Sequence, residues 1–309
     1  MRLPDVPLVR AHLKPTTFVE SERLDLELGL RVLLVSEVFQ HTGSFKFRGA
    51  MSAALHMSAP HLVTASSGNF GAALARAARE TKKRCTVVMP ETSAAVKIAH
   101  VKSYGAEVDL IDVTKIPREG RVTEIVASLP GAARVSPYDD DWVIAGNATL
   151  GDELFARETP DVVVVPVGGG GLSSGIVVAR DRLGLRSEIV GAEPALGNDA
   201  ARSLAAGRVV ANDREPPTLA DGARTLSLGT RNFDILRAGL AGIVEVSEDA
   251  IARALRLLFA AANMKVEPTG ALAVGALLAD PARFAGRRVA CVISGGNVDP
   301  SLFARLLAG

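Results

Sequence analysis

The sequence has little of what marks secreted, membrane or nucleic-acid-binding proteins. Its 309 residues include only two cysteines, Cys85 and Cys291, far apart in apolar runs, which argues against a disulfide framework and favours core thiols. The formal net charge is +1, so no charge excess favours a nucleic acid or an anionic membrane as a partner. No apolar run reaches the length of a membrane span, and the amino terminus lacks a signal or transit pattern. We therefore expect a soluble, cytoplasmic protein.

Aromatic residues make up only 4% of the chain, whereas 48% of it is hydrophobic, which suits helices packed closely on a sheet. Strands rich in Val, Ile and Leu are predicted at residues 31–35, 61–65, 85–89, 107–111, 162–166, 188–192 and 288–293. Helices are predicted at residues 71–80, 93–104, 121–128, 172–183 and 248–263. This alternation predicts an α/β fold with doubly wound, mostly parallel sheets. We expect a small domain at 61–139 and a large, discontinuous domain at 1–60 and 140–309.

Lys46 lies between Phe45 and Phe47 in the segment HTGSFKFRGA. Apolar neighbours shield an amine from water, and desolvation disfavours its charged form. A neutral amine is a nucleophile that can form an imine with a carbonyl cofactor. On its own the segment is explained more simply by a solvated lysine at the start of a helix. Whether Lys46 forms an imine is therefore judged together with the other segments.

Two further segments have the composition of anion-binding turns. SSGNFG, residues 66–71, follows a predicted strand and opens a helix, which suits a carboxylate or a phosphate; an ordinary turn is the alternative. Gly168, Gly169, Gly170 and Gly171 also lie between a strand and a helix. A bound phosphate explains four glycines better than a plain loop does, although neither a Walker motif nor the usual GxGxxG spacing is present.

VISGGN, residues 292–297, runs from a strand end into glycines. Ser294 is expected at the carboxyl edge of the sheet, where open α/β folds bind ligands, although a turn serine would also explain the segment. Together the four segments supply an amine, a carboxylate cradle, a phosphate cradle and a lone hydroxyl. Pyridoxal phosphate needs these groups when it acts on an amino acid, so we expect this cofactor and a small-molecule amino-acid substrate.

Almost the whole chain, from KPTTFVES to SGGN, resembles the fold type II pyridoxal-phosphate enzymes of the threonine/serine dehydratase and serine racemase family. The resemblance implies two domains with the cofactor in the cleft between them. It implies that Lys46 carries the cofactor, that Phe45 packs against its ring and that Ser294 faces its pyridine nitrogen. The remaining cofactor-binding residues that it implies are Asn69, Gly168, Gly169, Gly170, Gly171, Leu172 and Glu267.

The same resemblance implies where a substrate and a metal ion bind. The substrate carboxylate is expected on the turn formed by Ser66, Ser67, Gly68 and Asn69. In racemases of the group, the serine that matches Ser67 faces the side of the α-carbon opposite the lysine, and two acid–base groups on opposite faces permit racemisation. Metal-dependent members use an oxygen set that matches Glu193, the Gly197 carbonyl and Asp199. Such ligands suit Mg²⁺ or Ca²⁺; a solvated acidic loop is the alternative.

The chain departs from the family pattern at three places. The usual histidine after S-G-N is Phe70, the usual G-Q-G-T reads GNAT with Asn147 as its second residue, and the usual T-P-L reads PTT at residues 15–17. Phe70 and Asn147 are expected near the substrate. We therefore expect a bulkier or differently decorated 3-hydroxy amino acid than serine or threonine.

The predicted reaction is the dehydration and deamination of a 3-hydroxy amino acid to a 2-oxo acid and ammonia, with Lys46 and Ser67 as the catalytic residues. An amino-acid racemase is the main alternative. A β-replacement synthase is less consistent with GGGGL and SGGN, and a non-catalytic cofactor-binding protein also stays open. The resemblance implies a homodimer, and from the position of SGGN near the carboxyl end we expect no appended regulatory domain.

Overall fold

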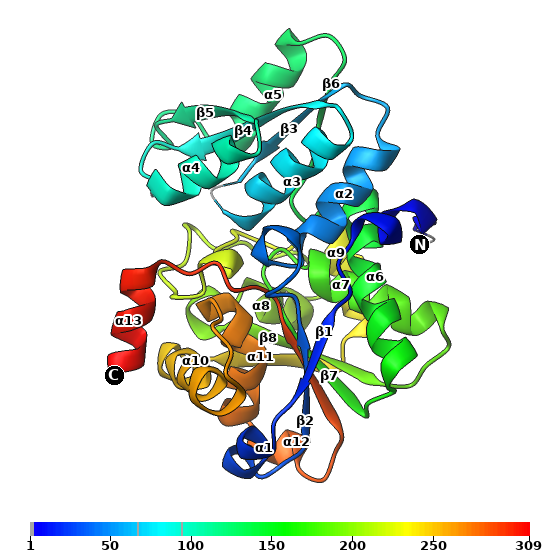
Figure 1. Cartoon of the computed structure of the whole chain (residues 1–309), viewed down its shortest axis with the longest axis vertical. Helices are drawn as coiled ribbons and strands as arrows, with labels where there is room; N and C mark the ends of the chain where they lie inside the picture. Colours follow the sequence, from blue (N-terminus) through cyan, green and yellow to red (C-terminus); the bar gives the residue numbers. More distant parts are fainter. Residues whose placement is uncertain (1–2, 67, 94) are drawn as a thin grey trace. The chain divides into compact units, whose positions relative to one another are not determined.

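The computed structural model describes residues 3–66, 68–93 and 95–309. Within them the chain forms two compact units (Figure 1). The first unit comprises Lys14–Phe45 and Ala148–Gly309, and the second comprises residues 3–13 and Lys46–Asn147. Each unit has its own sheet and its own hydrophobic core.

The sheet of the first unit has the strand order β1-β2-β10-β7-β8-β9. The strands are β1 (Thr17–Glu20), β2 (Val32–Ser36), β7 (Val162–Pro166), β8 (Glu188–Pro194), β9 (Gly242–Val246) and β10 (Val289–Ile293). Apart from the antiparallel pair β1–β2, neighbouring strands are parallel. The loops that follow the adjacent strands β10 and β7 therefore leave the same edge of the sheet side by side, which is where open α/β sheets bind ligands.

Helices cover both faces of this sheet, with α10 and α11 on one side and α6 and α7 on the other (Figure 1). Successive strand residues point to opposite faces, so Leu34 packs with α10 and α11 whereas Val35 packs with α6 and α7. Burial on both sides explains uninterrupted apolar strands such as VVVVP. The helices are α1 (Glu22–Leu28), α6 (Asp141–Arg157, which begins in the second unit), α7 (Gly171–Arg182), α8 (Asp199–Ala206), α9 (Thr230–Gly239), α10 (Glu248–Ala262), α11 (Pro268–Ala279), α12 (Pro281–Phe284) and α13 (Pro300–Ala308).

The second unit contains an all-parallel sheet in the order β5-β4-β3-β6. Leu62 packs against α2 and α3 on one face of this sheet, and its neighbour Val63 packs against α5 on the other. The strands are β3 (His61–Ala65), β4 (Arg84–Pro90), β5 (Glu107–Ile111) and β6 (Ala132–Arg134), and the helices are α2 (Lys46–His56), α3 (Asn69–Glu80), α4 (Ala95–Ser103) and α5 (Arg118–Ser128).

The predicted α/β architecture with mostly parallel sheets is confirmed, and each strand predicted from sequence is present. Strands β1, β6 and β9 were not predicted. All three lie at a sheet edge, where one side of the strand carries polar or partly exposed residues. Short edge strands therefore lack the continuous apolar run that identified the central strands.

The boundaries of the two units differ from those expected. Residues 46–60, expected in the large domain, belong to the second unit because α2 packs on α3 in a shared core. Residues 3–13, also expected in the large domain, belong to the second unit as well, because Val9 of the short 3₁₀ helix Pro7–His12 is buried in the same core. The first turns of α6 lie there too: a Cβ on Gly146 would overlap the Arg48 carbonyl, so α2 and α6 approach closely.

Cys85 and Cys291 are free thiols buried in the two cores. Burial raises the pKa of Cys85 to about 12, so its thiol stays protonated and behaves as a small apolar group. Across the described residues, no helix is long and apolar enough to cross a membrane.

His61, at the start of β3, makes the stability of the second unit depend on pH. Its Nε2 lies 2.8 Å from Thr86 Oγ1, and burial, followed by the nearby Arg84 charge, lowers its pKa. A lowered folded-state pKa favours the neutral ring, so this contribution is present above the unfolded pKa of about 6.5 and is lost as the pH falls towards the folded value. The loss is about 1.4 kcal/mol for each unit of pKa depression.

We expect acidification from about pH 7.5 to about pH 5 to destabilise the wild type more than His61→Gln, whose amide does not titrate. Urea unfolding at the two pH values measures both changes. Equal losses in the two proteins would show that His61 is not the group responsible.

Candidate active site

Ser294 directly follows β10 at the carboxyl edge of the six-stranded sheet. It is 1% exposed, and its buried Oγ has no hydrogen-bond partner. The Phe45 N–H donates to the Ser294 carbonyl at 3.0 Å, and Ser44 forms an antiparallel bridge with Gly295. The segment that leads into Lys46 is thus fixed to the segment that carries the open serine hydroxyl.

Glu267 lies against the same segment. It is 3% exposed, and its backbone N–H donates to the Gly295 carbonyl at 3.1 Å. A Cβ on Gly295 would lie 2.7 Å from Glu267 Oε1 and 2.8 Å from Ser44 Cβ, so a side chain there would displace both neighbours. Three residues predicted from sequence, Phe45, Glu267 and Ser294, are therefore brought together in the first unit.

The glycine loop follows β7 and ends where α7 begins at Gly171. Gly170 has φ +92°, and a Cβ there would lie 2.8 Å from Asn232 Cβ. The Gly169 carbonyl accepts hydrogen bonds from Asn232 Nδ2 at 2.8 Å and from the Gly229 N–H at 3.1 Å. No acidic residue lies in the first turn of α7, so the positive end of its dipole suits an anionic group.

A packed cluster connects this loop to Glu267. A Cβ on Gly168 would lie 3.0 Å from Ala223 Cα, and the Gly222 N–H donates to Thr269 Oγ1 at 2.9 Å. Thr269 stands two residues after Glu267 on α11. Thr269 and Asn232 were not predicted from sequence, because their role is to support other loops.

Lys46 is the first residue of α2 and is half-buried. Its Nζ donates to the Pro137 carbonyl at 3.0 Å and lies 5.8 Å from the centroid of the Phe70 ring. Phe47, the sequence neighbour expected to shield Lys46, is fully buried in the core of the second unit, with the Arg76 guanidinium over its ring. Successive helical residues project about 100° apart, so adjacent side chains face different surroundings.

The predicted carboxylate turn follows β3 and leads into α3, which begins at Asn69. Ser66 Oγ accepts hydrogen bonds from the Gly68 N–H at 3.3 Å and the Gly71 N–H at 3.0 Å, so its hydroxyl orders the turn. Phe70 is 2% exposed. Ser67 lies outside the described residues, and its predicted role is not addressed by the structure.

Asn147 lies on α6 close to the start of α2. A Cβ on Gly49 would lie 3.0 Å from Asn147 Oδ1, and Gly49 is one helical turn beyond Lys46. Asn147 is 1% exposed. The second unit therefore brings together Lys46, Phe70 and Asn147, of which the last two depart from the family pattern.

Glu193 and Asp199 are buried at the end of β8 and the start of α8. Burial raises the pKa of Glu193 to about 8 and that of Asp199 to about 6. The Glu193 carboxylate accepts from the Ala200 and Ala201 N–H groups at 2.8 and 2.9 Å, whereas Asp199 Oδ2 is buried without a hydrogen-bond partner. In the part of the chain that the structure describes, no three His, Cys, Asp or Glu side chains gather as a metal site, so a cation here would also need carbonyl or water ligands.

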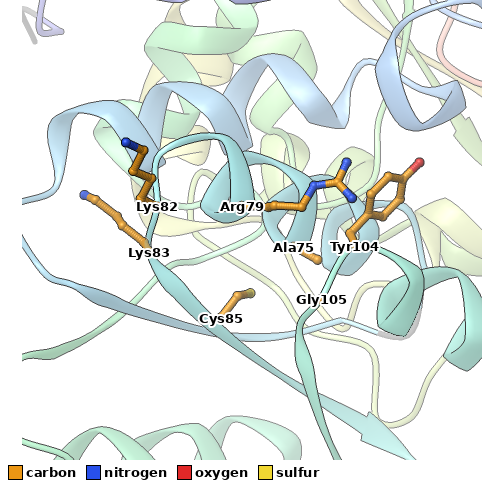
Figure 2. Close-up of a pocket in the computed structure, with 7 residues that line it drawn as sticks. All are labelled: Ala75, Arg79, Lys82, Lys83, Cys85, Tyr104 and Gly105. Carbon is orange, nitrogen blue, oxygen red and sulfur yellow. The ribbon is translucent and has the colours of Figure 1, made fainter.

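A hollow of about 280 Å³ lies beyond the end of α3 and contains none of the predicted residues. Its lining residues are Ala75, Arg79, Lys82, Lys83, Cys85, Tyr104 and Gly105. Arg79 stacks on the Tyr104 ring at 5.2 Å, and Lys83 Nζ donates to the Met57 carbonyl. Figure 2 shows Lys82 and Lys83 pointing away from Arg79 and Tyr104. The cations do not converge, so the hollow is not built to hold one anion.

Comparison with known proteins agrees with these features. The family model described as pyridoxal-phosphate dependent enzyme matches residues 9–295. The chain belongs to this family.

Relatives of the chain within the family are named for two activities. An L-threo-3-hydroxyaspartate ammonia-lyase from Pseudomonas sp. is 38% identical, over 95% of this chain and 93% of the relative. A serine racemase from Schizosaccharomyces pombe is 35% identical, over 95% of this chain and 92% of the relative. Among solved structures, a threonine deaminase from T.th. is 41% identical with a TM-score of 0.89, covering 96% of this chain and 99% of that one. The fold, the cofactor and the enzyme class predicted from sequence are thereby confirmed.

We expect Gly170→Ala to weaken the binding of pyridoxal phosphate by about tenfold or more. Alanine at a left-handed φ costs about 1–2 kcal/mol, and its Cβ would press on Asn232 and move the loop. Titration of the apo-protein with the cofactor, followed by absorbance, measures the affinity.

Gly184→Ala is the matched control. Gly184 also has a left-handed φ, +65°, but a Cβ there meets nothing within 4 Å. Both variants should lose folding stability, and only Gly170→Ala should lose cofactor affinity; an unchanged affinity would show that this loop does not hold the phosphate.

Proposed function

We propose that the chain is an ammonia-lyase that converts a 3-hydroxy amino acid to a 2-oxo acid and ammonia through loss of the β-hydroxyl. The observation that carries this proposal is the Ser294 hydroxyl, which is buried, neutral and open to a partner at the carboxyl edge of the sheet. The names of relatives support it, since ammonia-lyases of 3-hydroxyaspartate and a threonine deaminase are 35–41% identical to the chain.

The described residues fit the cofactor of the family. Ser294 offers a hydroxyl for a ring nitrogen, the loop from Gly168 to Leu172 offers close backbone approach for a phosphate, and Lys46 offers the amine. When bound, the cofactor supplies an electron sink for the α-carbon of the substrate. A neutral serine does not hold the ring nitrogen protonated as a carboxylate would, which weakens the sink and favours prompt loss of a leaving group over a long-lived carbanion.

The groups of the second unit are proposed to handle the substrate. The turn that leads from Ser66 to Asn69 binds its carboxylate at the positive end of α3. Lys46 Nζ takes the α-proton. The centroid of the Phe70 ring lies 5.8 Å from Nζ, so the ring covers one side of the amine.

The proposed substrate is a 3-hydroxy amino acid larger than serine, and 3-hydroxyaspartate is the first candidate. Relatives from Pseudomonas sp. and Saccharomyces cerevisiae are named for it, at 38% and 35% identity. Phe70 and Asn147, which replace the usual family residues, lie in the unit that carries Lys46. Amino-acid racemisation is the second candidate, supported by relatives named serine racemase at 35% identity.

A panel of serine, threonine and the threo and erythro isomers of 3-hydroxyaspartate tests the proposal. We expect a 3-hydroxyaspartate to exceed serine and threonine in kcat/KM by about tenfold or more, equivalent to about 1.4 kcal/mol in the transition state. Each reaction is assayed for 2-oxo acid and ammonia, and in D₂O for label in both α-epimers of the substrate. Lys46→Ala should abolish turnover, and Lys46→Arg, which keeps a cation, should not restore it.

Three results of this panel would count against the proposal. Higher kcat/KM for serine or threonine would remove the substrate assignment. Deuterated, inverted substrate without ammonia would identify a racemase. Turnover by Lys46→Ala would remove Lys46 from the chemistry.

We propose further that Glu193, the Gly197 carbonyl and Asp199 hold Mg²⁺ or Ca²⁺. Support comes from the burial of both carboxyl groups and from Asp199 Oδ2, which has no hydrogen-bond partner. Oxygen ligands of this kind suit hard divalent ions. Such an ion would stabilise the loop between β8 and α8 rather than take part in the chemistry.

We expect Mg²⁺ or Ca²⁺ to raise the unfolding temperature of the metal-free protein, with a gain of about 2.7 kcal/mol at one hundred times the Kd. Asp199→Asn should abolish the gain. Asp161→Asn, which alters an exposed carboxylate paired with Arg288 in the same unit, is the control and should keep it. A gain retained by Asp199→Asn would place the ion elsewhere.

We also propose that the enzyme is a cytoplasmic homodimer, on the strength of the family resemblance. Light scattering on the purified holoenzyme measures the oligomeric state.

A further inference from the structure

The residues just before Lys46 form a backbone turn that has an unfavourable conformation. Thr42 has φ 62° and ψ 13°, and Gly43 follows with φ 75°. Two consecutive left-handed residues reverse the chain just before Ser44. Glycine adopts this conformation freely, but for a β-branched residue such as threonine it is a genuine outlier. Strain of this kind costs about 1–3 kcal/mol and persists only where the surroundings hold it.

The surroundings that hold this turn come from the residues after β10. The Gly296 N–H donates to the Gly43 carbonyl at 3.0 Å, and the Phe45 N–H donates to the Ser294 carbonyl at 3.0 Å. Asn297 Nδ2 donates to the Thr42 carbonyl at 2.7 Å. Asn297 also covers the next residue directly, because a Cβ on Gly43 would overlap its Oδ1.

The entry to the turn is fixed separately. Gln40 is 4% exposed; its Oε1 accepts from the His41 N–H at 3.0 Å, and its Nε2 donates to the Lys14 carbonyl at 2.7 Å. With Gln40 held on one side and Phe45 on the other, the path of the chain between them depends on the conformation of Thr42 and Gly43. Asn297 contacts both of these residues through its side chain.

We propose that Asn297 is a positioning residue that locks the strained turn at Thr42 and thereby holds Ser44 and Phe45 in register with Ser294. If its amide is lost, Thr42 relaxes towards negative φ, and the change reaches Ser44 and Phe45, whose pairing with residues 294 and 295 then weakens. Ser294 stays in place because it is held by the sheet. The phenylalanine and the serine, which the family resemblance places against the cofactor ring, then lose their register. This inference rests on the proposed binding of pyridoxal phosphate at Phe45 and Ser294.

A double-mutant cycle tests the proposal. Asn297→Ala removes the lock, and Thr42→Gly removes the strain, because glycine takes the left-handed conformation without cost. We expect Asn297→Ala to lower the cofactor affinity of the apo-protein by about tenfold, equivalent to about 1.4 kcal/mol of strain released. In the Thr42→Gly background the same change should cost less than about threefold, since no strain remains to be held.

Two readouts distinguish positioning from general stability. The first is the pH midpoint of the visible absorbance of the lysine-bound cofactor, which should shift in Asn297→Ala and return in the double variant. The second is kinetic: kcat should fall while KM changes little. Ser187→Ala is the control, because it also loses one side-chain donor to a carbonyl of the first unit, that of Pro160 at 2.6 Å. It should lose stability and keep both the affinity and the pH midpoint.

The proposal is overturned if Asn297→Ala keeps the wild-type affinity and pH midpoint, or if it loses the same affinity in both backgrounds. If Asn297→Ala alone does not fold, a folded double variant with near-wild-type affinity supports the proposal, and an unfolded one overturns it. Failure of the proposed function is separate: it appears as cofactor absorbance that survives Lys46→Ala, or as a loaded wild-type protein that eliminates no hydroxy amino acid.

Discussion

The backbone pairing between residues 42–45 and residues 294–297 is the constraint from which the arrangement of the first unit follows. Strand β10 is central in the sheet and cannot move without disturbing β2 and β7 on either side. Ser44 and Phe45 pair with Gly295 and Ser294, which directly follow β10. The sheet therefore holds the backbone rigidly as far as Phe45, one residue before Lys46. Glu267 uses the same anchor, because its N–H binds the Gly295 carbonyl. Catalytic geometry needs this kind of support from rigid elements.

Parallel pairing supplies the second part of the arrangement. Since β10 and β7 are neighbours with the same direction, the serine after one and the glycines after the other emerge together. The cluster of Gly168, Ala223, Gly222 and Thr269 then closes the space between them through α11. The glycine loop after β7 and the Ser294 segment after β10 lie far apart in the sequence but are held by one sheet edge and one helix. This support explains how two segments so rich in glycine keep a defined conformation.

Sequence reasoning predicted the parts that depend on local pattern. The central strands follow from uninterrupted apolar runs, and the glycine loop and Ser294 follow from strand ends that run into glycine. The roles of Asn297, Thr269 and Asn232 could not be predicted, because each supports a backbone group far away in the sequence. The boundary between the units was misplaced at α2 for a similar reason. Along the chain α2 comes soon after β2, a strand of the first unit, but the buried face of α2 packs on α3 in the core of the second unit. The shielding of Lys46 was expected from its sequence neighbours, whereas the ring found near it is that of Phe70, 24 residues away.

The surroundings of Lys46 in the second unit limit what its amine can do. The Pro137 carbonyl only accepts hydrogen bonds, and the Phe70 ring has no proton to exchange. An imidazole at position 70 could pass a proton to or from Nζ, but phenylalanine cannot. Neither of these two groups can therefore take a proton from Lys46 when it acts as the proposed base. Such an amine suits a reaction in which the same group removes one proton and a leaving group departs soon afterwards. Racemisation has one further requirement, a proton donor on the opposite face of the α-carbon, and this is the role that the family resemblance implies for Ser67.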